Sequence, residues 1–206
     1  MTSWDSRLIR SLDIFIALIA IAVLLPVMVI ICVAIFMQDG KTPIFAHSRI
    51  GRFGKRFPCL KLRTMVVDAD ERLRRLLEQD PAARLEWETD QKLRNDPRIT
   101  PLGAFLRKSS LDELPQLINV LCGHMSLVGP RPIVDAEIAR YGRYFQFYCA
   151  VRPGITGLWQ VSGRNNTSYR RRVAIDTVYS RSKSLRGDLF ILGRTVPAVL
   201  MSRGSF

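Results

Sequence analysis

Two adjacent carboxylates, Asp112 and Glu113, lie between leucines in the segment RKSSLDELPQL (107–117). One interpretation is a helix start, because Ser110 and Glu113 have the spacing of a capping box and acidic residues are favoured in a first helical turn. The other is a reactive site, since a carboxylate that attacks phosphorus forms an acyl phosphate able to pass its phosphoryl group to a second acceptor. Pro115 favours a helix that begins a residue or two after Ser110, with the acidic pair at its mouth. The dipole there would stabilise an ionised Asp112 and also attract a phosphate, so the two interpretations are compatible.

Arginines in two loops rich in glycine and proline indicate an anionic ligand. Arg131 lies in MSLVGPRP (125–132), and Arg152 and Arg164 lie in RPGITGLWQVSGRNN (152–166). A rigid loop that presents a guanidinium suits a phosphate, because arginine offers forked donors and keeps its charge. Each loop alone also fits an ordinary turn with a surface arginine. The chain contains neither a P-loop nor a GxGxxG fingerprint.

The net charge of the chain also indicates anionic partners. Lys and Arg number 31 against 18 Asp and Glu, which gives a net charge of +13. Such an excess favours nucleic acid, phosphorylated small molecules or an acidic membrane surface as partners. A membrane-tethered nucleic-acid-binding protein is disfavoured, because no helix-turn-helix, zinc finger or RNA-binding signature is present. Four cysteines without CxxC spacing and two distant histidines argue against zinc and are compatible with a reducing, cytoplasmic setting.

An uncharged apolar run, residues 14–37, predicts a membrane-associated helix. It is long enough to cross a hydrocarbon core of about 30 Å and too long for a signal peptide. Basic residues flank both ends, so the positive-inside rule selects no translocated end. Pro26, at the middle, can bend the helix. A kinked span and a bent helix that enters and leaves on one face are equally compatible with these residues.

The rest of the chain predicts an α/β fold that is mainly helical with a small β-hairpin. We expect a membrane-inserted segment at 1–40 and a catalytic domain at 41–206 with a hairpin turn at Gly51–Gly54. A solvated helix is expected at 65–79, a polar loop at 87–100, and two short helices between Pro101 and Gly123. The tail from Tyr169 fits either basic amphipathic helices on an anionic membrane or ordinary packed helices.

Four blocks carry a resemblance to a known family: FAHSRIGRFGKRFPCLKLRTM, RITPLGAFLRKSSLDELPQLINVLCGHMSLVGPRP, RPGITGLWQVSGRNN and AIDTVYS…DLFILGRTV. With these blocks in this order, the chain resembles bacterial sugar transferases of the monotopic phosphoglycosyl transferase type. The resemblance runs from about Asp13 almost to the C-terminus, and DELPQL with SLVGPRP is its most specific part. WQVSGRNN and PAVLMSRGSF are most similar to exopolysaccharide enzymes that transfer galactose 1-phosphate.

The resemblance implies transfer of a sugar 1-phosphate from a UDP-sugar to undecaprenyl phosphate on the cytoplasmic face of the bacterial inner membrane, with release of UMP and no role for nucleic acid. It implies Asp112 as nucleophile, Glu113 as its partner, Mg²⁺ at this pair and an aspartyl intermediate. The other implied positions are phosphate binders or family positions of less defined role: Arg107, Arg131, Lys61, Arg63, Arg164, Asp176 and Asp188. Membrane lipids are implied partners, and a homo-oligomer is compatible with the sequence.

Two departures from the family pattern concern the membrane rather than the chemistry. Family members often carry a serine before the central proline of the apolar helix, whereas this chain has Leu25 before Pro26. One hydroxyl fewer is then available to the backbone groups that a bend frees. In the tail, Tyr179 and Asp188 are retained, but a tryptophan common in the family is replaced.

Overall fold

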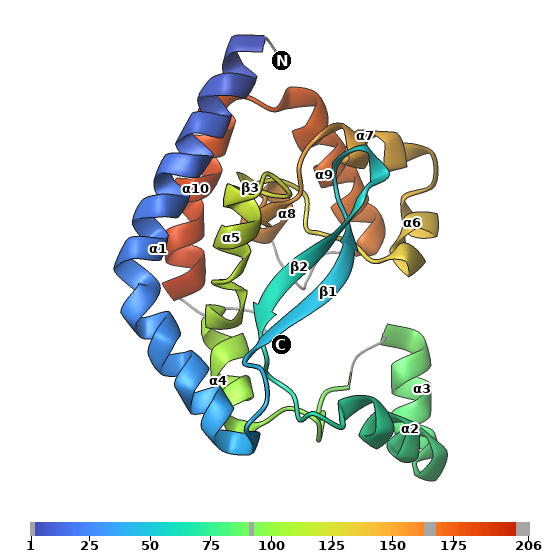
Figure 1. Cartoon of the computed structure of the whole chain (residues 1–206). Coiled ribbons are helices and arrows are strands. Elements are labelled where there is room, and N and C mark those ends of the chain that lie inside the picture. Colours follow the sequence, from blue (N-terminus) through green and yellow to red (C-terminus); the bar gives the residue numbers. More distant parts are fainter. Residues whose placement is uncertain (1–2, 91–92, 163–167, 201–206) are drawn as a thin grey trace.

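The computed structural model of the 206-residue chain describes residues 3–90, 93–162 and 168–200. The described part is mainly helical, as the sequence predicts, and contains the predicted hairpin together with a second two-stranded sheet that the sequence did not indicate (Figure 1). In chain order the elements are α1 (Ser3–Asp39), β1 (Ile44–Ile50), η1 (Arg52–Gly54), β2 (Arg56–Leu62), α2 (Ala69–Gln79), α3 (Pro81–Asp90), α4 (Pro101–Ser109), η2 (Leu111–Glu113), α5 (Gln116–Leu121), β3 (Ser126–Val128), α6 (Asp135–Tyr141), η3 (Gly142–Tyr144), α7 (Phe145–Ala150), β4 (Gly154–Thr156), α8 (Leu158–Val161), α9 (Tyr169–Ser182) and α10 (Leu185–Leu200).

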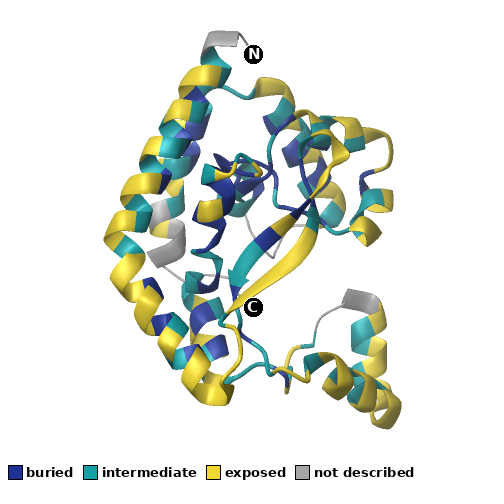
Figure 2. Cartoon of the chain, viewed as in Figure 1, coloured by how far each residue is buried: buried dark blue, intermediate teal, exposed yellow. Residues whose placement is uncertain are grey.

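The apolar run forms one long helix, α1, which is bowed around one side of the fold (Figure 1). Its length and composition are sufficient to cross a membrane. Only a narrow inner stripe is buried against the rest of the chain, and Figure 2 shows the outer side largely exposed. Many of the exposed side chains are large and apolar, among them Phe15, Val23, Ile30 and Met37. This surface is compatible with a lipid environment, because soluble helices seldom expose so much contiguous apolar area.

Both ends of α1 are bonded to the rest of the fold. Near its start, Asp13 accepts hydrogen bonds from Ser126 Oγ at 2.8 Å and from Leu127 N at 2.9 Å. At its end, Asp39 forms an ion pair with Arg63, whose Nη2 lies 2.6 Å from Asp39 Oδ1. Both ends of α1 are therefore held against the same body of protein.

The predicted hairpin is confirmed, with its turn at η1. β1 and β2 pair antiparallel, and Phe45 lies opposite Lys61. Phe53 and Gly54 both adopt positive φ, at 61° and 71°, which closes the turn. Lys61 and Cys59 are two residues apart and point to the same face of the strand, where they border the candidate site.

The second sheet joins two loops that are distant in sequence. β3 and β4 pair in parallel, with Ser126 opposite Gly154. Their approach is close enough that a Cβ on Gly154 would lie 2.0 Å from Gly129 N. Only glycine fits there, and this contact fixes the VGPRP loop that carries Arg131. The main core cluster surrounds this sheet and includes Val120, Met125 and Val128.

Two expectations from the sequence are wrong in the arm formed by α2 and α3. The helix predicted at 65–79 begins only at Ala69, because Met65 forms a bridge with Ile99 instead. The polar loop predicted from residue 87 is wrong for residues 87–90, which belong to α3. Asp80 Oδ1 accepts hydrogen bonds from Ala82 N and Ala83 N and caps α3. An aspartate followed by a proline is a sequence signal for a helix start, so the start of α3 could have been predicted.

The tail forms two helices with different surroundings. α9 buries Val173, Asp176 and Tyr179 and contacts α6, α7 and α8, so it is a packed helix. α10 runs beside α1 (Figure 1) and leaves Leu189 and Phe190 exposed. Of the two interpretations of the tail, ordinary packing thus applies to α9, while α10 presents apolar side chains next to the apolar helix.

Candidate active site

The acidic pair lies in η2, a single helical turn between α4 and α5. Ser110 ends α4 in the left-handed conformation, φ 58°, and its side chain caps neither turn. The predicted capping box is therefore wrong, because Ser110 is committed to terminating the preceding helix. The next helix starts later than Ser110, as predicted, but by more than the expected one or two residues: η2 intervenes, and α5 starts at Gln116 directly after Pro115.

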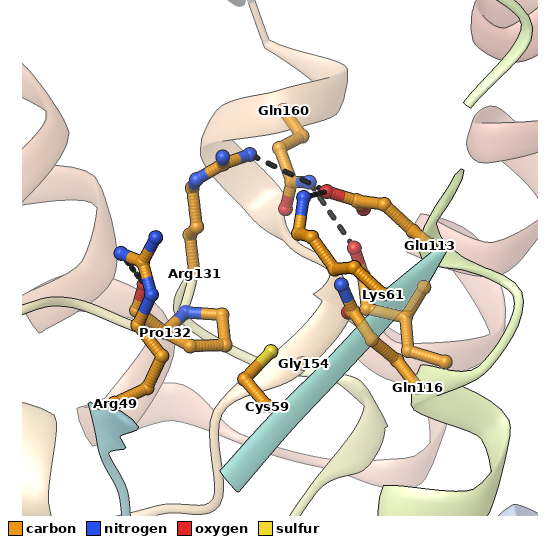
Figure 3. Close-up of a pocket in the computed structure, with 10 residues that line it drawn as sticks. Arg49, Cys59, Lys61, Glu113, Gln116, Arg131, Pro132, Gly154 and Gln160 are labelled. Carbon is orange, nitrogen blue, oxygen red and sulfur yellow. Dashed lines mark hydrogen bonds and ion pairs between the residues drawn. The ribbon is translucent and has the colours of Figure 1, made fainter. Parts of the chain in front are cut away.

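Lys61 joins the two carboxylates. Its Nζ lies 3.4 Å from Asp112 Oδ2 and 2.8 Å from Glu113 Oε1. Both carboxylate side chains are largely buried, with 10% of Asp112 and 19% of Glu113 exposed. The two acids therefore converge on Lys61 Nζ, and Figure 3 shows Lys61 reaching Glu113 at the cavity.

Two further guanidiniums border the pair. Arg131 Nη1 lies 3.9 Å from Glu113 Oε1 (Figure 3). Arg107, on the last turn of α4, donates from Nε to Thr64 Oγ1 at 2.9 Å, and its charge favours ionised Asp112. The hydroxyl of Thr64 holds the Arg107 side chain on the Asp112 side of the site. The site is therefore a pair of carboxylates enclosed by cations, as a phosphate-handling site requires.

The surroundings push the pKa values of the two acids apart. Burial raises the pKa of Asp112, and ionised Glu113 adds to the increase, although Lys61 opposes it. Burial acts on Glu113 as well, but the charges of Lys61, Arg131 and Arg49 outweigh it and hold the pKa of Glu113 below its usual value. Asp112, whose carboxylate is the more basic, thus lies next to Glu113, which stays ionised. In paired acids, such a difference in pKa commonly accompanies different roles.

A small cavity of about 10 Å³ opens at the pair. Its lining includes three residues that sequence reasoning did not select: Arg49, Gln116 and Gln160. Arg49 Nη1 donates to Pro132 O at 3.3 Å and so contacts the loop that carries Arg131 (Figure 3). Strand alternation could have identified Arg49, because its partner Phe57 lies on the same face of β2 as Lys61. No local signal marked Gln160, which the fold brings in from α8.

Of the predicted positions, Lys61, Glu113 and Arg131 line this cavity. Asp112 and Arg107 lie beside it without lining it, and Arg63, Asp176 and Asp188 are engaged elsewhere. Arg63 is engaged with Asp39 and with the carbonyl of Thr42, at 3.0 Å. Asp176 and Asp188 are buried and accept hydrogen bonds from Tyr141 Oη at 2.7 Å and Tyr179 Oη at 2.8 Å, respectively. These contacts are structural. Arg164 lies outside the described residues.

A divalent cation would find two carboxylate ligands here. Among the described residues, no group of three or more His, Cys, Asp and Glu side chains is placed to hold a metal. Asp112 and Glu113 nevertheless converge on a single cationic atom, Lys61 Nζ. Two carboxylates fit Mg²⁺, which usually takes one or two from the protein and its remaining oxygens from water and substrate phosphates.

Comparison with known proteins agrees with this geometry. The model of the family described as bacterial sugar transferase matches residues 4–202. The chain is 52% identical over 199 residues to the UDP-galactose-lipid carrier transferase of Erwinia amylovora, covering 96% of this chain and 41% of that protein. It is 49% identical over 197 residues to the undecaprenyl-phosphate galactose phosphotransferase of Salmonella typhimurium, covering 96% and 41%.

Relatives of other lengths and names also match. The exopolysaccharide production protein ExoY of Sinorhizobium fredii is 48% identical over 197 residues, covering 96% of this chain and 87% of that protein. A UDP-glucose:undecaprenyl-phosphate glucose-1-phosphate transferase of Caulobacter vibrioides is 38% identical over 205 residues, covering 96% and 71%. The chain thus spans about two fifths of some relatives and most of others. With its acidic pair and surrounding cations inside the matched residues, this protein belongs to the bacterial sugar transferase family.

Proposed function

We propose that the protein transfers a hexose 1-phosphate from a UDP-sugar to undecaprenyl phosphate, releases UMP, and thereby begins the assembly of an exopolysaccharide. The observation that carries the proposal is the buried Asp112–Glu113 pair, which Lys61 joins at the cavity lined by Lys61, Glu113 and Arg131. Names of relatives that refer to UDP-galactose, undecaprenyl phosphate and exopolysaccharide production support the choice of substrates.

The proposed reaction has two displacements at one phosphorus atom. An oxygen of Asp112 attacks the phosphorus that carries the sugar, the bond to the bridging oxygen of the diphosphate breaks, and UMP leaves. The protein then carries an acyl phosphate ester of the sugar. A phosphate oxygen of undecaprenyl phosphate attacks the same phosphorus, and the carboxylate of Asp112 leaves. One site can in this way serve a soluble donor and a lipid acceptor in turn.

The electrostatics of the site give the two acids different roles in this scheme. The raised pKa of Asp112 indicates a more basic and hence more nucleophilic carboxylate. Glu113 remains ionised beside Lys61 and Arg131. Together the pair would hold Mg²⁺, which would supply compensation of the negative charge on the diphosphate. Arg131 and Arg107 would bind phosphoryl oxygens during the transfer.

The proposed location is the cytoplasmic face of the bacterial inner membrane. The apolar outer side of α1 and the adjacent exposed side chains of α10 supply the contact with lipid. Because both ends of α1 are bonded to the same body of protein, we propose that the helix dips into one leaflet and returns. The active site then faces the donor in the cytoplasm and the acceptor in the leaflet.

The sugar is proposed to be galactose, with glucose and N-acetylated sugars as alternatives. Relatives named for galactose are 52% and 49% identical, against 38% for one named for glucose. A panel of UDP-sugars assayed for UMP release in the presence of undecaprenyl phosphate tests this assignment. Faster turnover of UDP-glucose than of UDP-galactose would reverse it without affecting the proposed chemistry.

The nucleophile is tested by intact mass spectrometry of the protein mixed with UDP-sugar alone. We expect a phosphosugar adduct and one equivalent of UMP for the native chain, and neither for Asp112→Asn, because an amide cannot form the acyl phosphate. Glu113→Gln should still form the adduct, more slowly. The exposed Asp70→Asn in α2 is the matched control and should behave as the native chain.

Full turnover by Asp112→Asn would place the nucleophile elsewhere, and UMP release that requires the lipid would indicate direct transfer between substrates. Turnover in excess chelator would exclude the proposed Mg²⁺. The rate of adduct formation should fall as pH decreases through a value above the ordinary range of aspartate, because protonated Asp112 cannot attack.

A further inference from the structure

A second cavity, of about 50 Å³, lies between the start of α1, the turn η1 and the end of α9. It is several times larger than the roughly 10–15 Å³ that one water molecule needs. None of its residues lines the active-site cavity. Its lining is drawn from five separate segments of the chain and consists of Ser6, Ile9, Arg10, Asp13, Arg52, Ser126, Ala150, Val151, Arg152 and Lys183.

Four cationic side chains converge on this cavity: Arg10, Arg52, Arg152 and Lys183. The lining contains a single carboxylate, Asp13, and its two oxygens already accept hydrogen bonds from Ser126 Oγ and Leu127 N. The cavity therefore carries a substantial excess of positive charge.

The cations are only partly satisfied by the protein itself. Arg10 donates to Leu121 O at 3.2 Å, and Arg152 donates from Nε to Gly123 O at 2.9 Å. Lys183 lies 3.7 Å from Asp188 Oδ2. In contrast, the Nε of Arg52 is buried and has no hydrogen-bond partner in the described part of the chain. A buried donor without a partner is costly, and it would be satisfied by an oxygen of a bound anion.

The mutual repulsion of these groups is visible in their acid–base properties. Burial lowers the pKa of Arg52, and the charge of Arg152 lowers it further. Burial also lowers the pKa of Lys183, with Arg152 and Arg52 adding to the decrease and Asp188 opposing it. Positive charges brought together in this way destabilise one another unless an anion lies among them.

The helix that contributes to the cavity carries exposed apolar side chains on its opposite face. Leu8 and Phe15, on the part of α1 that contributes to the lining, are 52% and 62% exposed. Phe53, at the tip of the hairpin and directly after Arg52, is 69% exposed. A cationic cavity beside the exposed Phe53, on a helix whose other face is exposed and apolar, fits the boundary between lipid headgroups and acyl chains.

We propose that this cavity binds a phosphate group, supplied by the headgroup of an anionic membrane lipid. Arg52 and Arg152 donate to its oxygens, and Arg10 and Lys183 contribute charge. The bound headgroup fixes the start of α1 and the hairpin tip at the membrane surface. This site is independent of the proposed sugar transfer, because it shares no residue with the active-site cavity.

The test measures the Tm of the full chain in an uncharged maltoside detergent as the ligand concentration is increased at constant ionic strength. Unfolding is monitored by tryptophan fluorescence. One arm uses inorganic phosphate, and the other uses dihexanoyl phosphatidylglycerol. We expect Arg52→Gln to raise the concentration needed for half of the lipid-induced shift in Tm by about tenfold or more, the loss typical of a hydrogen bond to a charged group. Arg74→Gln is the matched control, because Arg74 is an exposed arginine on the distant α2–α3 arm (Figure 1).

A shift that depends on Arg52 with the lipid alone identifies a headgroup site, and one that also appears with inorganic phosphate identifies a site for free phosphate. If Arg52→Gln behaves as Arg74→Gln and the native chain in both titrations, the proposal is overturned. Should Arg52→Gln fail to fold, Arg152→Gln and Arg52→Lys replace it. We expect a similar loss for the first and a smaller loss for the second, which keeps the charge. If Arg152→Gln binds the lipid with the affinity of the native chain, the proposed phosphate site is likewise contradicted.

Discussion

Single residues in this protein owe their chemistry to burial. Asp112 and Glu113 are neighbours of the same chemical type, yet burial dominates for one and surrounding cations for the other. The same balance applies far from the cavity, at Asp176. Burial raises the pKa of Asp176 to about 6, although the hydrogen bond from Tyr141 and the charge of Arg172 oppose the increase. Its carboxyl group therefore titrates within an accessible pH range.

Asp176 predicts a specific dependence of stability on pH. Because its folded pKa is above the ordinary aspartate value, the stabilisation is present below about pH 4 and is lost as pH rises through 6. Relative to Asp176→Asn, the native chain should therefore lose up to about 3 kcal/mol of unfolding free energy between pH 4 and 7. Thermal unfolding in detergent across this range measures the difference.

Tyr141→Phe provides an internal check on that explanation. Loss of the hydroxyl removes a hydrogen bond that lowers the pKa of Asp176, so the inflection of the stability curve should move to higher pH. An inflection that stays in place, or a difference between native chain and Asp176→Asn that is constant with pH, would mean that Asp176 is ionised in the folded protein throughout.

At the scale of elements, the site depends on how closely β3 and β4 approach. Gly129 N donates to Thr156 O at 2.9 Å, and Gly154 N donates to Pro130 O at 2.9 Å. These bonds fix both ends of the loop before Arg131. A Cβ on Gly154 would meet Gly129 N at 2.0 Å and Thr156 O at 2.4 Å, and both are backbone atoms that cannot move independently.

Gly154→Ala should therefore displace the loop that carries Arg131. We expect a loss of about 2–3 kcal/mol of unfolding free energy from overpacking, and about 100-fold lower turnover, since a displacement of about 1 Å at a positioned group has this effect. Gly193→Ala is the control, because a Cβ there meets nothing within 4 Å and alanine should stabilise α10 by about 0.5–1 kcal/mol. Native turnover by Gly154→Ala would show that the loop tolerates separation of the strands.

For the molecule as a whole, the course of α1 is the feature from which we propose its arrangement at the membrane. Arg10 and Asp13 bind the region around α5 and β3, and Asp39 binds Arg63 at the end of the hairpin. A straight spanning helix of this length would place its ends on opposite faces, about 30 Å of hydrocarbon apart. Contacts at both ends with one body of protein are the observation behind the proposal that both ends lie on the same face.

Labelling of single cysteines in sealed membrane vesicles tests this arrangement. In a background in which Cys32, Cys59 and Cys149 are replaced by alanine, the exposed Cys122 marks the side of the catalytic body. In the same background, Ser11→Cys and Lys41→Cys, each combined with Cys122→Ser, mark the two ends of α1. We expect a membrane-impermeant maleimide to modify all three positions from the same face. Modification of Ser11→Cys and Lys41→Cys from opposite faces would show that α1 spans the membrane.

The sequence by itself determined the features that depend on local patterns. The unbroken apolar run predicted α1 and the paired glycines predicted the hairpin turn, because helix length and turn conformation are properties of adjacent residues. Pro115 predicted a helix start after Ser110, but the start at Gln116 is later than the expected one or two residues. Ordered motifs within the matched residues also determined the family.

Which distant side chains lie close together depends on the tertiary structure. It brought Lys61 between the carboxylates, added Arg49 and Gln160 to the cavity, and assigned Asp176 to the interior rather than to the cavity lining. It also reassigned Ser110 from cap to helix terminator. Such placements follow from the packing of strands and helices far apart in sequence, and burial then sets the pKa of each acid. The adjacency of Asp112 and Glu113 could be seen in the sequence, whereas the opposite shifts of their pKa values come from the fold.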